Sequence, residues 1–214
     1  MHLPVPFLIG SQGVTVQGDP APWRDAFASL PAIAIPAAIE PAFCARMVER
    51  AAQAHFAEDD VAYIGTRAIE EPQRVGRALS LLLHSPELLH WLEQATGTGT
   101  LRAVAGRLVE TRANHRDALD WHDDRDDLTR RLAIVIDLSD QRYQGGQFQL
   151  RRKGEAEPLL SHDHAQAGSV LIFAVRPELE HRVTPVLAGG PRRVFAGWFL
   201  TQPEHASGAL GASG

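Results

Sequence analysis

The chain has 214 residues, of which 44% are hydrophobic and 22% are charged, and its formal net charge at pH 7 is −5. This length suits one domain with a sizeable core, and the charge lacks the basic excess typical of nucleic-acid-binding proteins. A single cysteine, Cys44, excludes an intrachain disulfide framework. The first residues lack the basic and apolar regions of a secretory signal, and no apolar run approaches the length of a membrane span. We therefore expect a cytoplasmic protein that binds neither membranes nor nucleic acids.

Residues 1–99 are predicted to form a mainly helical segment. Phe43 and Met47 are spaced as on one face of a helix, which Pro41 would open. Ser85 and Pro86 are typical of a helix start, with the serine as cap and the proline in the first turn. We predict helices at 41–54, 77–83 and 86–95, and short strands at 14–16, 32–36 and 61–64, the last ended by Gly65.

The pattern changes after Gly99, where short β-like runs alternate with turn residues. Strands are predicted at 100–111, 131–138, 146–151, 169–174, 180–186 and 193–201. Many short strands of this kind suggest a sandwich or a closed double sheet. The expected fold class is α+β, in a single domain over 1–214. Residues 1–99 would support a β core at 100–201, and 202–214 would form a flexible tail.

His122 and Asp124 form a His-x-Asp pair, and His181 lies further along the chain after an apolar run. Two imidazoles and one carboxylate can occupy one face of an octahedral Fe(II) ion and leave the other positions open for substrate and oxygen. Because one residue separates His122 from Asp124, both side chains would point to the same side of an extended strand. We therefore predict that His122, Asp124 and His181 bind one metal ion.

Further motifs follow the His-x-Asp pair in a characteristic order. They are Gly145-Gly146-Gln147-Phe148, the apolar run 168–173 that begins with glycine and ends with phenylalanine, His181-Arg182-Val183-Thr184-Pro185-Val186, and Gly190-Pro191-Arg192 leading to Trp198-Phe199. Over residues 100–201 this combination resembles the Fe(II)- and 2-oxoglutarate-dependent dioxygenases, in particular their prolyl-4-hydroxylase-like branch. The combination is specific, whereas a His-x-Asp pair alone is a weak signal.

The resemblance implies a double-stranded β-helix, a jelly-roll and cupin-like core, with helices packed outside it. It also implies that His122, Asp124 and His181 are the iron ligands, and that the cofactors are Fe(II) and 2-oxoglutarate. Oxygen would be the co-substrate, with ascorbate as a candidate reductant. The expected reaction is hydroxylation of an unactivated carbon, with succinate and carbon dioxide as co-products. Family members that halogenate lack the carboxylate ligand, so Asp124 favours hydroxylation.

Arg192 matches the family arginine that pairs with the distal carboxylate of 2-oxoglutarate. The planar fork of donors on arginine suits a carboxylate, and the guanidinium stays charged in a partly dry site. Alternation along a strand would place Val194 and Trp198 on the same face as Arg192. We therefore predict that Arg192, Val194 and Trp198 contact the cofactor.

Two positions depart from the prolyl-hydroxylase pattern. Arg112 lies in the neighbourhood where many members place a tyrosine, and it is a candidate to project into the mouth of the site. Gln147 stands where the family motif has glutamate. Both changes count against peptidyl proline as the substrate, and Trp198, which stands where nucleic-acid demethylases carry a second arginine, counts against that activity. We expect the substrate to be a small molecule or a protein side chain.

Several alternatives stay open at this stage. A non-catalytic, cupin-like sensor that binds metal or 2-oxoglutarate would share the same core. Four aspartates could make the entrance acidic and favour a cationic substrate: Asp117, Asp120, Asp126 and Asp127. His162 and His164 could ligate a metal, although their polar loop at 161–165 is more typical of a turn. The role of Tyr143 and the oligomeric state are not predicted.

Overall fold

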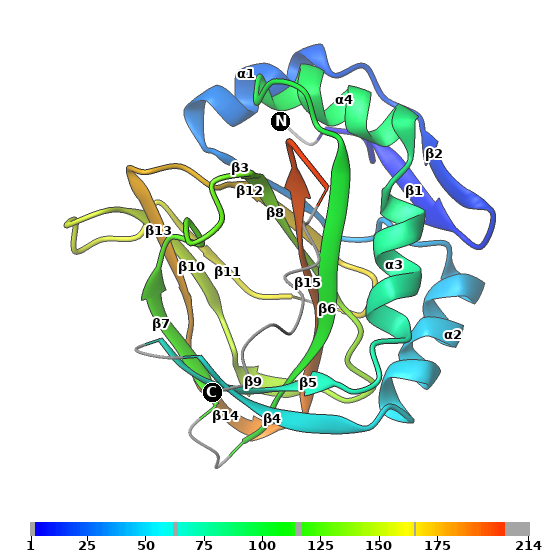
Figure 1. The fold of residues 1–214 in the computed structure, drawn as a ribbon, viewed down its shortest axis with the longest axis vertical. Helices are drawn as coiled ribbons and strands as arrows, with labels where there is room; N and C mark the ends of the chain where they lie inside the picture. Colours follow the sequence, from blue (N-terminus) through cyan, green and yellow to red (C-terminus); the bar gives the residue numbers. More distant parts are fainter. Residues whose placement is uncertain (1–2, 62–63, 114–116, 165, 204–214) are drawn as a thin grey trace, which may run out of the picture.

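The computed structural model describes residues 3–61, 64–113, 117–164 and 166–203. Figure 1 shows strands that curl into a half-open barrel, with helices packed along one side of it. The described helices all lie before residue 97, and the long strands of the barrel follow residue 102. The helices lie in the N-terminal segment, as predicted, but strands at 32–35, 56–61 and 65–70 of that segment also belong to the main sheet, so the β core is not confined to 100–201.

Most strands belong to one curled sheet, whose described strand pairs are antiparallel. In spatial order these strands are β11 (Leu160–His162), β10 (Phe148–Arg152), β13 (Leu179–Val183), β7 (Ala118–His122), β5 (Gly65–Glu70), β6 (Ala103–Thr111), β15 (Arg192–Leu200), β8 (Arg130–Asp137), β12 (Val170–Ala174) and β3 (Ala32–Ile35), and β4 (Phe56–Val61) pairs with β5. Two further pairs lie outside this sheet: β1 (Phe7–Gly10) with β2 (Gly13–Val16), and β9 (Tyr143–Gly145) with β14 (Val186–Gly189).

The helices have apolar faces that pack against the sheet or each other. They are α1 (Ala21–Ser29), α2 (Pro41–Ala52), α3 (Val75–Leu83) and α4 (Pro86–Thr96). At the start of α4, the Ser85 hydroxyl accepts a hydrogen bond from the backbone N–H of Leu88, and Gly97 ends the helix with a left-handed φ of 64°. The three predicted helices are therefore present, and their ends differ from the prediction by at most two residues.

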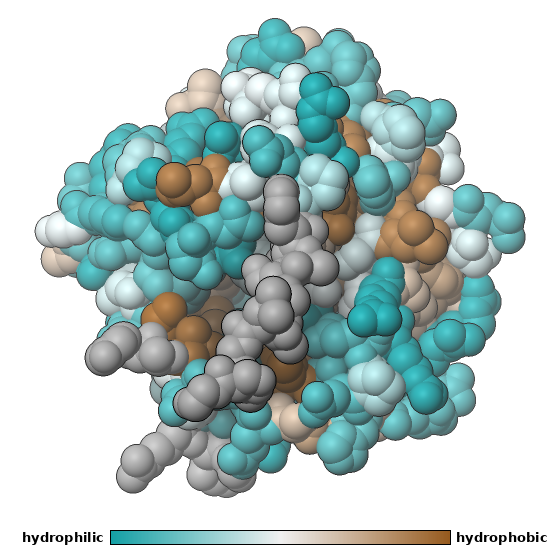
Figure 2. All heavy atoms as spheres, viewed as in Figure 1, coloured by the Kyte–Doolittle hydropathy of each residue, from teal (hydrophilic) through white to brown (hydrophobic). Residues whose placement is uncertain are grey.

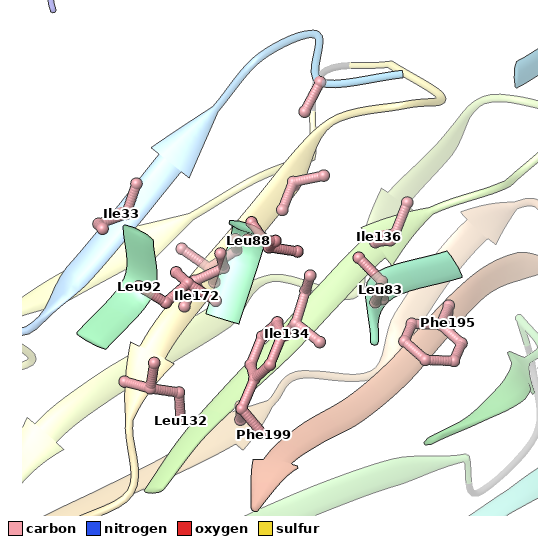
Figure 3. Packing of buried hydrophobic residues seen from close by; sticks show 14 of the residues in the cluster. Ile33, Leu83, Leu88, Leu92, Leu132, Ile134, Ile136, Ile172, Phe195 and Phe199 are labelled. Atoms are coloured by element: carbon pink, nitrogen blue, oxygen red, sulfur yellow. The ribbon is translucent and has the colours of Figure 1, made fainter. Parts of the chain in front are cut away.

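Leucines of α3 and α4 form the core with side chains of the central strands. Figure 3 shows Leu83 and Leu88 in one cluster with Ile134, Phe195 and Phe199, and all five are fully buried. Burial of each such side chain stabilises the fold by about 1.5–3 kcal/mol. Because side chains alternate along β15, the residues between these phenylalanines face the interior of the barrel.

The strand register places the functional residues opposite each other. In the pairing of β13 with β7, His181 lies opposite His122. In the pairing of β15 with β6, Arg192 lies opposite Thr111. Long-range pairing thus brings together residues that are about 60 to 80 positions apart in the sequence.

Some predicted elements differ from the structure. The strand predicted at 61–64 is wrong in its bounds: β4 ends at Val61 and β5 begins at Gly65, while residues 62–63 lie outside the described part. Gly65 is the first residue of β5. Only glycine fits at this position, because β7 passes so close that a Cβ would overlap the carbonyl oxygen of Ala118. Helix α1 was not predicted, because only Trp23 and Phe27 are buried along it. Most of the predicted tail, from residue 204 onward, also lies outside the description.

The face seen in Figure 2 is largely hydrophilic, and its hydrophobic residues form small separate areas. Among the helices that the structure describes, none is both long enough and apolar enough to cross a membrane. The large apolar residues of the chain instead gather in the core between helices and sheet.

Candidate active site

The three predicted metal ligands lie together in the structure. The ligand atoms of His122, Asp124 and His181 are all within 4.8 Å of one another. Nε2 of His122 lies 3.6 Å from Oδ1 of Asp124, and Nε2 of His181 lies 3.4 Å from Oδ2 of Asp124. Metal–ligand bonds of about 2.0–2.2 Å at right angles would place donor atoms about 3 Å apart. A small contraction would therefore let one ion take all three ligands.

Both histidines are held in the form that binds a metal. Nδ1 of His122 lies 2.7 Å from the carbonyl oxygen of Asp120. A carbonyl only accepts, so Nδ1 carries the proton and Nε2 offers its lone pair. His181 packs against Phe148 and Phe173, with ring centroids 5.6 Å and 4.7 Å away. Burial is the main cause that lowers the pKa of His181 to about 4, which keeps this imidazole neutral.

Asp124 reaches the site by a route that the sequence did not predict. Strand β7 ends at His122, and Asp124 lies beyond it with a left-handed φ of 54°. A turn, and not the alternation of an extended strand, therefore brings its carboxylate beside the imidazoles. Aspartate tolerates this backbone conformation better than most residues. The indole N–H of Trp198 donates to Oδ2 of Asp124 at 2.9 Å and fixes the orientation of the carboxylate.

The surroundings of Asp124 favour its charged form. Burial opposes ionisation, but His181, His122 and the Trp198 N–H together hold the pKa of this carboxyl below its usual value. The Arg130 guanidinium adds to this effect and lies over the Trp198 ring, 4.1 Å from its centroid. An ionised carboxylate is thus present at neutral pH beside the neutral imidazole of His181.

The three ligands line a narrow cavity of about 70 Å³, which we call the inner cavity. Its walls are largely apolar and include Ile134, Phe148, Phe173 and Val194. Arg192 and Thr111 also line it, and both residues are buried. Within the described part of the chain, Nε of Arg192 and Oγ1 of Thr111 have no hydrogen-bond partner. Buried polar atoms are nearly always paired, so this end of the cavity is suited to a ligand that carries acceptor atoms.

The alternation predicted for β15 is seen in the structure. Val194 and Trp198 line the inner cavity together with Arg192. Arg193 instead bonds to Glu110 at 2.9 Å and to Asp140 at 2.6 Å, and it does not line the cavity. Neighbouring arginines on one strand therefore have different surroundings.

The predicted Gly-Gly element and residues that precede it lie near Arg192. Gly146 has a left-handed φ of 63°, and a Cβ there would lie 2.7 Å from Cδ of Arg192. The hydroxyl of Tyr143 donates to Asp137 at 2.7 Å. Burial above all raises the pKa of Tyr143, so this hydroxyl stays protonated near Arg192. Glycine at position 146 thus makes room for the arginine side chain.

A histidine pair also lies near Arg192, and its position was not predicted. The rings of His162 and His164 are 4.8 Å apart, and Nδ1 of His164 lies 2.8 Å from the Ser169 hydroxyl. Neither Nε2 has a hydrogen-bond partner among the described residues. Burial first, then Arg192 and His162, lowers the pKa of His164 to about 2. The polar sequence around the two histidines suggested a turn, whereas His162 ends the short strand β11. Thr111 similarly ends β6. The pairing of these strands in the fold, and not the local sequence, shows that His162 and Thr111 lie near the site.

Arg112 does not occupy the position considered for it. Its backbone N–H and Nε both donate to Asp117, at 2.9 Å and 3.2 Å, and its Nη2 lies 3.6 Å from Glu58. It does not line the inner cavity. The expectation that Arg112 projects into the mouth of the site is therefore not supported, because a buried aspartate holds it.

Comparison with known proteins agrees with this geometry. Residues 108–200 match the sequence profile described as the 2OG-Fe(II) oxygenase superfamily, and this range contains all the side chains proposed from the sequence for the site. No curated protein matches the chain in sequence. The profile match, which spans the β core, supports the predicted 2OG-Fe(II) oxygenase superfamily, whose cofactors are Fe(II) and 2-oxoglutarate.

Solved structures show the same fold at low sequence identity. An oxidoreductase of the 2OG-Fe(II) oxygenase family from Burkholderia pseudomallei aligns with a TM-score of 0.66 and 14% identity over 90% of this chain and 95% of that one. A prolyl-4-hydroxylase from Pseudomonas putida gives 0.62 and 20% over 86% and 100%. A prolyl hydroxylase from Trichoplax adhaerens, solved with a peptide of hypoxia inducible factor, gives 0.64 and 15% over 85% and 88%. The predicted double-stranded β-helix with flanking helices is confirmed.

Proposed function

We propose that this 2-oxoglutarate-dependent dioxygenase binds Fe(II) through His122, Asp124 and His181 and hydroxylates an unactivated carbon of its substrate. One observation carries the proposal. The three ligands line the same narrow cavity as a buried arginine, Arg192, whose Nε has no partner among the described residues. Metal ligands and a carboxylate-binding group in one dry cavity are what binding of 2-oxoglutarate to iron requires.

The donor set fits Fe(II). Two neutral imidazole nitrogens and one carboxylate form the facial set of non-haem Fe(II) oxygenases, and it leaves coordination positions open. With its cofactors bound, the site supplies an oxidation in which 2-oxoglutarate becomes succinate and carbon dioxide and one oxygen atom enters a C–H bond of the substrate. The protein contributes the geometry: Asp120 fixes the tautomer of His122, and Trp198 orients Asp124.

The inner cavity fits 2-oxoglutarate. Arg192 would pair with the distal carboxylate, and the unpartnered hydroxyl of Thr111 would donate to the same group. Val194 and Trp198 would flank the cofactor, as predicted from the strand alternation. The apolar walls would exclude water and strengthen the ion pair, because charges attract more strongly where the effective dielectric constant is low. The predicted substrates, a small molecule or a protein side chain, remain part of this proposal.

An anaerobic titration with Fe(II) and 2-oxoglutarate, followed by visible absorption, tests the cofactor assignments. We expect a metal-to-ligand charge-transfer band that is absent in His181→Ala and needs far more 2-oxoglutarate in Arg192→Ala. Arg193→Ala is the matched control, since that side chain bonds to Glu110 and Asp140 outside the cavity. No band in the wild type with iron bound would refute the proposal.

Admission of air then separates an enzyme from a sensor. An enzyme should release succinate slowly even without its substrate, and Asp124→Ala should abolish this release. A protein that forms the band but releases no succinate in air, with or without a panel of candidate substrates, would be a sensor built on the same core.

A further inference from the structure

A second and wider cavity adjoins the metal ligands. This outer cleft has a volume of about 410 Å³, within the range of about 300–1,000 Å³ typical of small-molecule sites. It shares five lining residues with the inner cavity: Arg67, Leu119, His122, Asp124 and Trp198. If the inner cavity holds 2-oxoglutarate, the outer cleft is the remaining approach to the metal for a primary substrate. The inference below therefore rests on the proposed function.

Four arginines from separate segments line the outer cleft. They are Arg67 of β5, Arg107 of β6, Arg125 of the loop after β7, and Arg130 at the start of β8. Arg107 and Arg130 flank the Trp198 ring, at 5.8 Å and 4.1 Å from its centroid. Arg125 is exposed; its backbone N–H donates to Asp123 at 3.1 Å, and its charge helps to lower the pKa of that carboxyl. The cleft therefore offers guanidinium groups directly beside the metal site.

The carboxylates that line the outer cleft are each paired with a cation or assigned to the metal. Asp124 belongs to the metal, and Asp123 is paired with Lys153. Asp126 is paired with Arg130 at 2.6 Å. Outside the cleft lining, Asp59 bonds to Arg67 at 2.8 Å. With these pairs formed, the exposed Arg125 and a divalent metal bound at Asp124 would give the cleft an excess of positive charge.

The acidic entrance considered from the sequence is not formed. Of the four aspartates in question, Asp126 alone lines the outer cleft. Asp117 is buried and bonds to Arg112, and Asp127 accepts hydrogen bonds from the backbone and hydroxyl of Thr129. Folding thus assigns these carboxylates to local contacts, and arginines line the cleft instead.

We propose that the outer cleft binds the primary substrate as a small carboxylic acid, whose carboxylate pairs with Arg125 and Arg107. The arginine fork matches two carboxylate oxygens and gives stronger hydrogen bonds than neutral groups do. Val61, Ile64 and Leu119 supply apolar surface on which the carbon chain of the acid can pack. The head group would hold the molecule at the arginines, while the chain places a C–H bond toward the metal.

Ligand-observed NMR on the full chain tests this, with Mn(II) as a redox-inert paramagnetic ion and saturating 2-oxoglutarate. The probes are butanoate, hexanoate and octanoate, each with the amide and the amine of the same chain. Mn(II) broadens only proton signals that come close to the metal. We expect carboxylates to bind about tenfold more tightly than their amides or amines, and more weakly as salt is added.

Arginine variants locate the head group. Arg125→Gln and Arg107→Gln should each weaken carboxylate binding about tenfold, about the loss of one charge-assisted hydrogen bond. Arg77→Gln, at an exposed position on α3, is the control and should bind like the wild type. The proposal fails if the amines bind more tightly than the carboxylates, or if no probe binds near Mn(II). It also fails if a proline peptide binds and its affinity is the same in both arginine variants as in the wild type.

The charge-transfer band distinguishes this failure from failure of the proposed function. If the same protein forms the band with Fe(II) and 2-oxoglutarate but shows no preference for carboxylates, the anionic-substrate proposal is wrong and the dioxygenase site stands. If the band does not form with iron bound, both proposals fall.

Discussion

The inner cavity and the outer cleft meet at the same metal ligands but are built differently. The inner cavity, of about 70 Å³, is lined mainly by residues of long paired strands, and Arg192 within it is buried. The outer cleft, of about 410 Å³, is lined by residues of several strands and of the loop that follows β7, and Arg125 of that loop is exposed. The inner cavity is narrow and largely apolar, whereas the outer cleft is wider and lined by more charged groups.

This difference matches a division of labour. A cofactor that is constant across a superfamily suits a site built on strand register, which fixes side chains precisely. A substrate that differs between members suits loops and strand ends, which can change without disturbing the core. Residues that line both cavities, among them His122, Asp124 and Trp198, should therefore affect the binding of both ligands, whereas residues that line one cavity should affect one ligand only.

The largest effect is expected at the shared carboxylate. Asp124→Asn keeps the shape, tolerates the left-handed φ of 54°, and can still accept from Trp198, but it removes the charge that the metal needs. We expect Fe(II) affinity to fall about 100-fold or more, as measured by metal titration. Asp123→Asn, next in the chain but paired with Lys153, is the control. Equal loss in both variants would mean that the effect is general electrostatics and not ligation.

Trp198→Phe tests the link between the two regions. Phenylalanine keeps the ring on which Arg130 lies but removes the N–H that holds Asp124. Loss of such a supporting hydrogen bond should weaken metal binding about 10–100-fold. Trp91→Phe removes another indole N–H, bonded to the Gly18 carbonyl at 2.8 Å and remote from the site, and should leave metal binding unchanged. If Trp198→Phe also leaves metal affinity unchanged, contacts other than the Trp198 N–H fix the orientation of Asp124.

The same contrast explains what the sequence could predict. His122, His181 and Arg192 were predictable because their motifs follow one another at characteristic positions along the β core. Thr111 and His164 were not, because their nearness to Arg192 depends on strand pairing that no local pattern encodes. The fold class followed from alternating apolar runs, whereas β4 was missed because its sequence, FAEDDV, is acidic and half-buried.

The outer cleft shows the other limit of sequence reasoning. Asp117, Asp120, Asp126 and Asp127 are close in sequence and suggested an acidic entrance, but each of them makes local contacts with residues nearby in the chain. The arginines that line the cleft are spread from position 67 to position 130. Aspartates that are close together in the sequence therefore did not show which arginines line this part of the molecule.

Gly146→Ala should affect the inner cavity only. The added Cβ would lie 2.7 Å from Cδ of Arg192 and displace the guanidinium. We expect 2-oxoglutarate affinity to fall about tenfold, while the carboxylate probes bind the outer cleft as before. Gly154→Ala imposes a similar backbone strain, at a φ of 79°, but its Cβ meets nothing within 4 Å. A tenfold loss in this control as well would attribute the effect to strain and not to Arg192.

The smallest effect should appear in stability at low pH, through the buried histidine near Arg192. The pKa of His164 is lowered to about 2 in the fold, chiefly by burial, against 6.5 for a free histidine. Between these values the unfolded chain binds a proton that the native state does not, so the free energy of unfolding falls as the pH falls. One such group contributes at most about 1.4 kcal/mol per pH unit. Urea unfolding of His164→Gln below pH 6.5 should therefore show a shallower pH dependence than the wild type, with His84→Gln at an exposed site as the control. If the free energy of unfolding depends on pH equally in the wild type and both variants, His164 is accessible to water in solution and is not part of the buried region around Arg192.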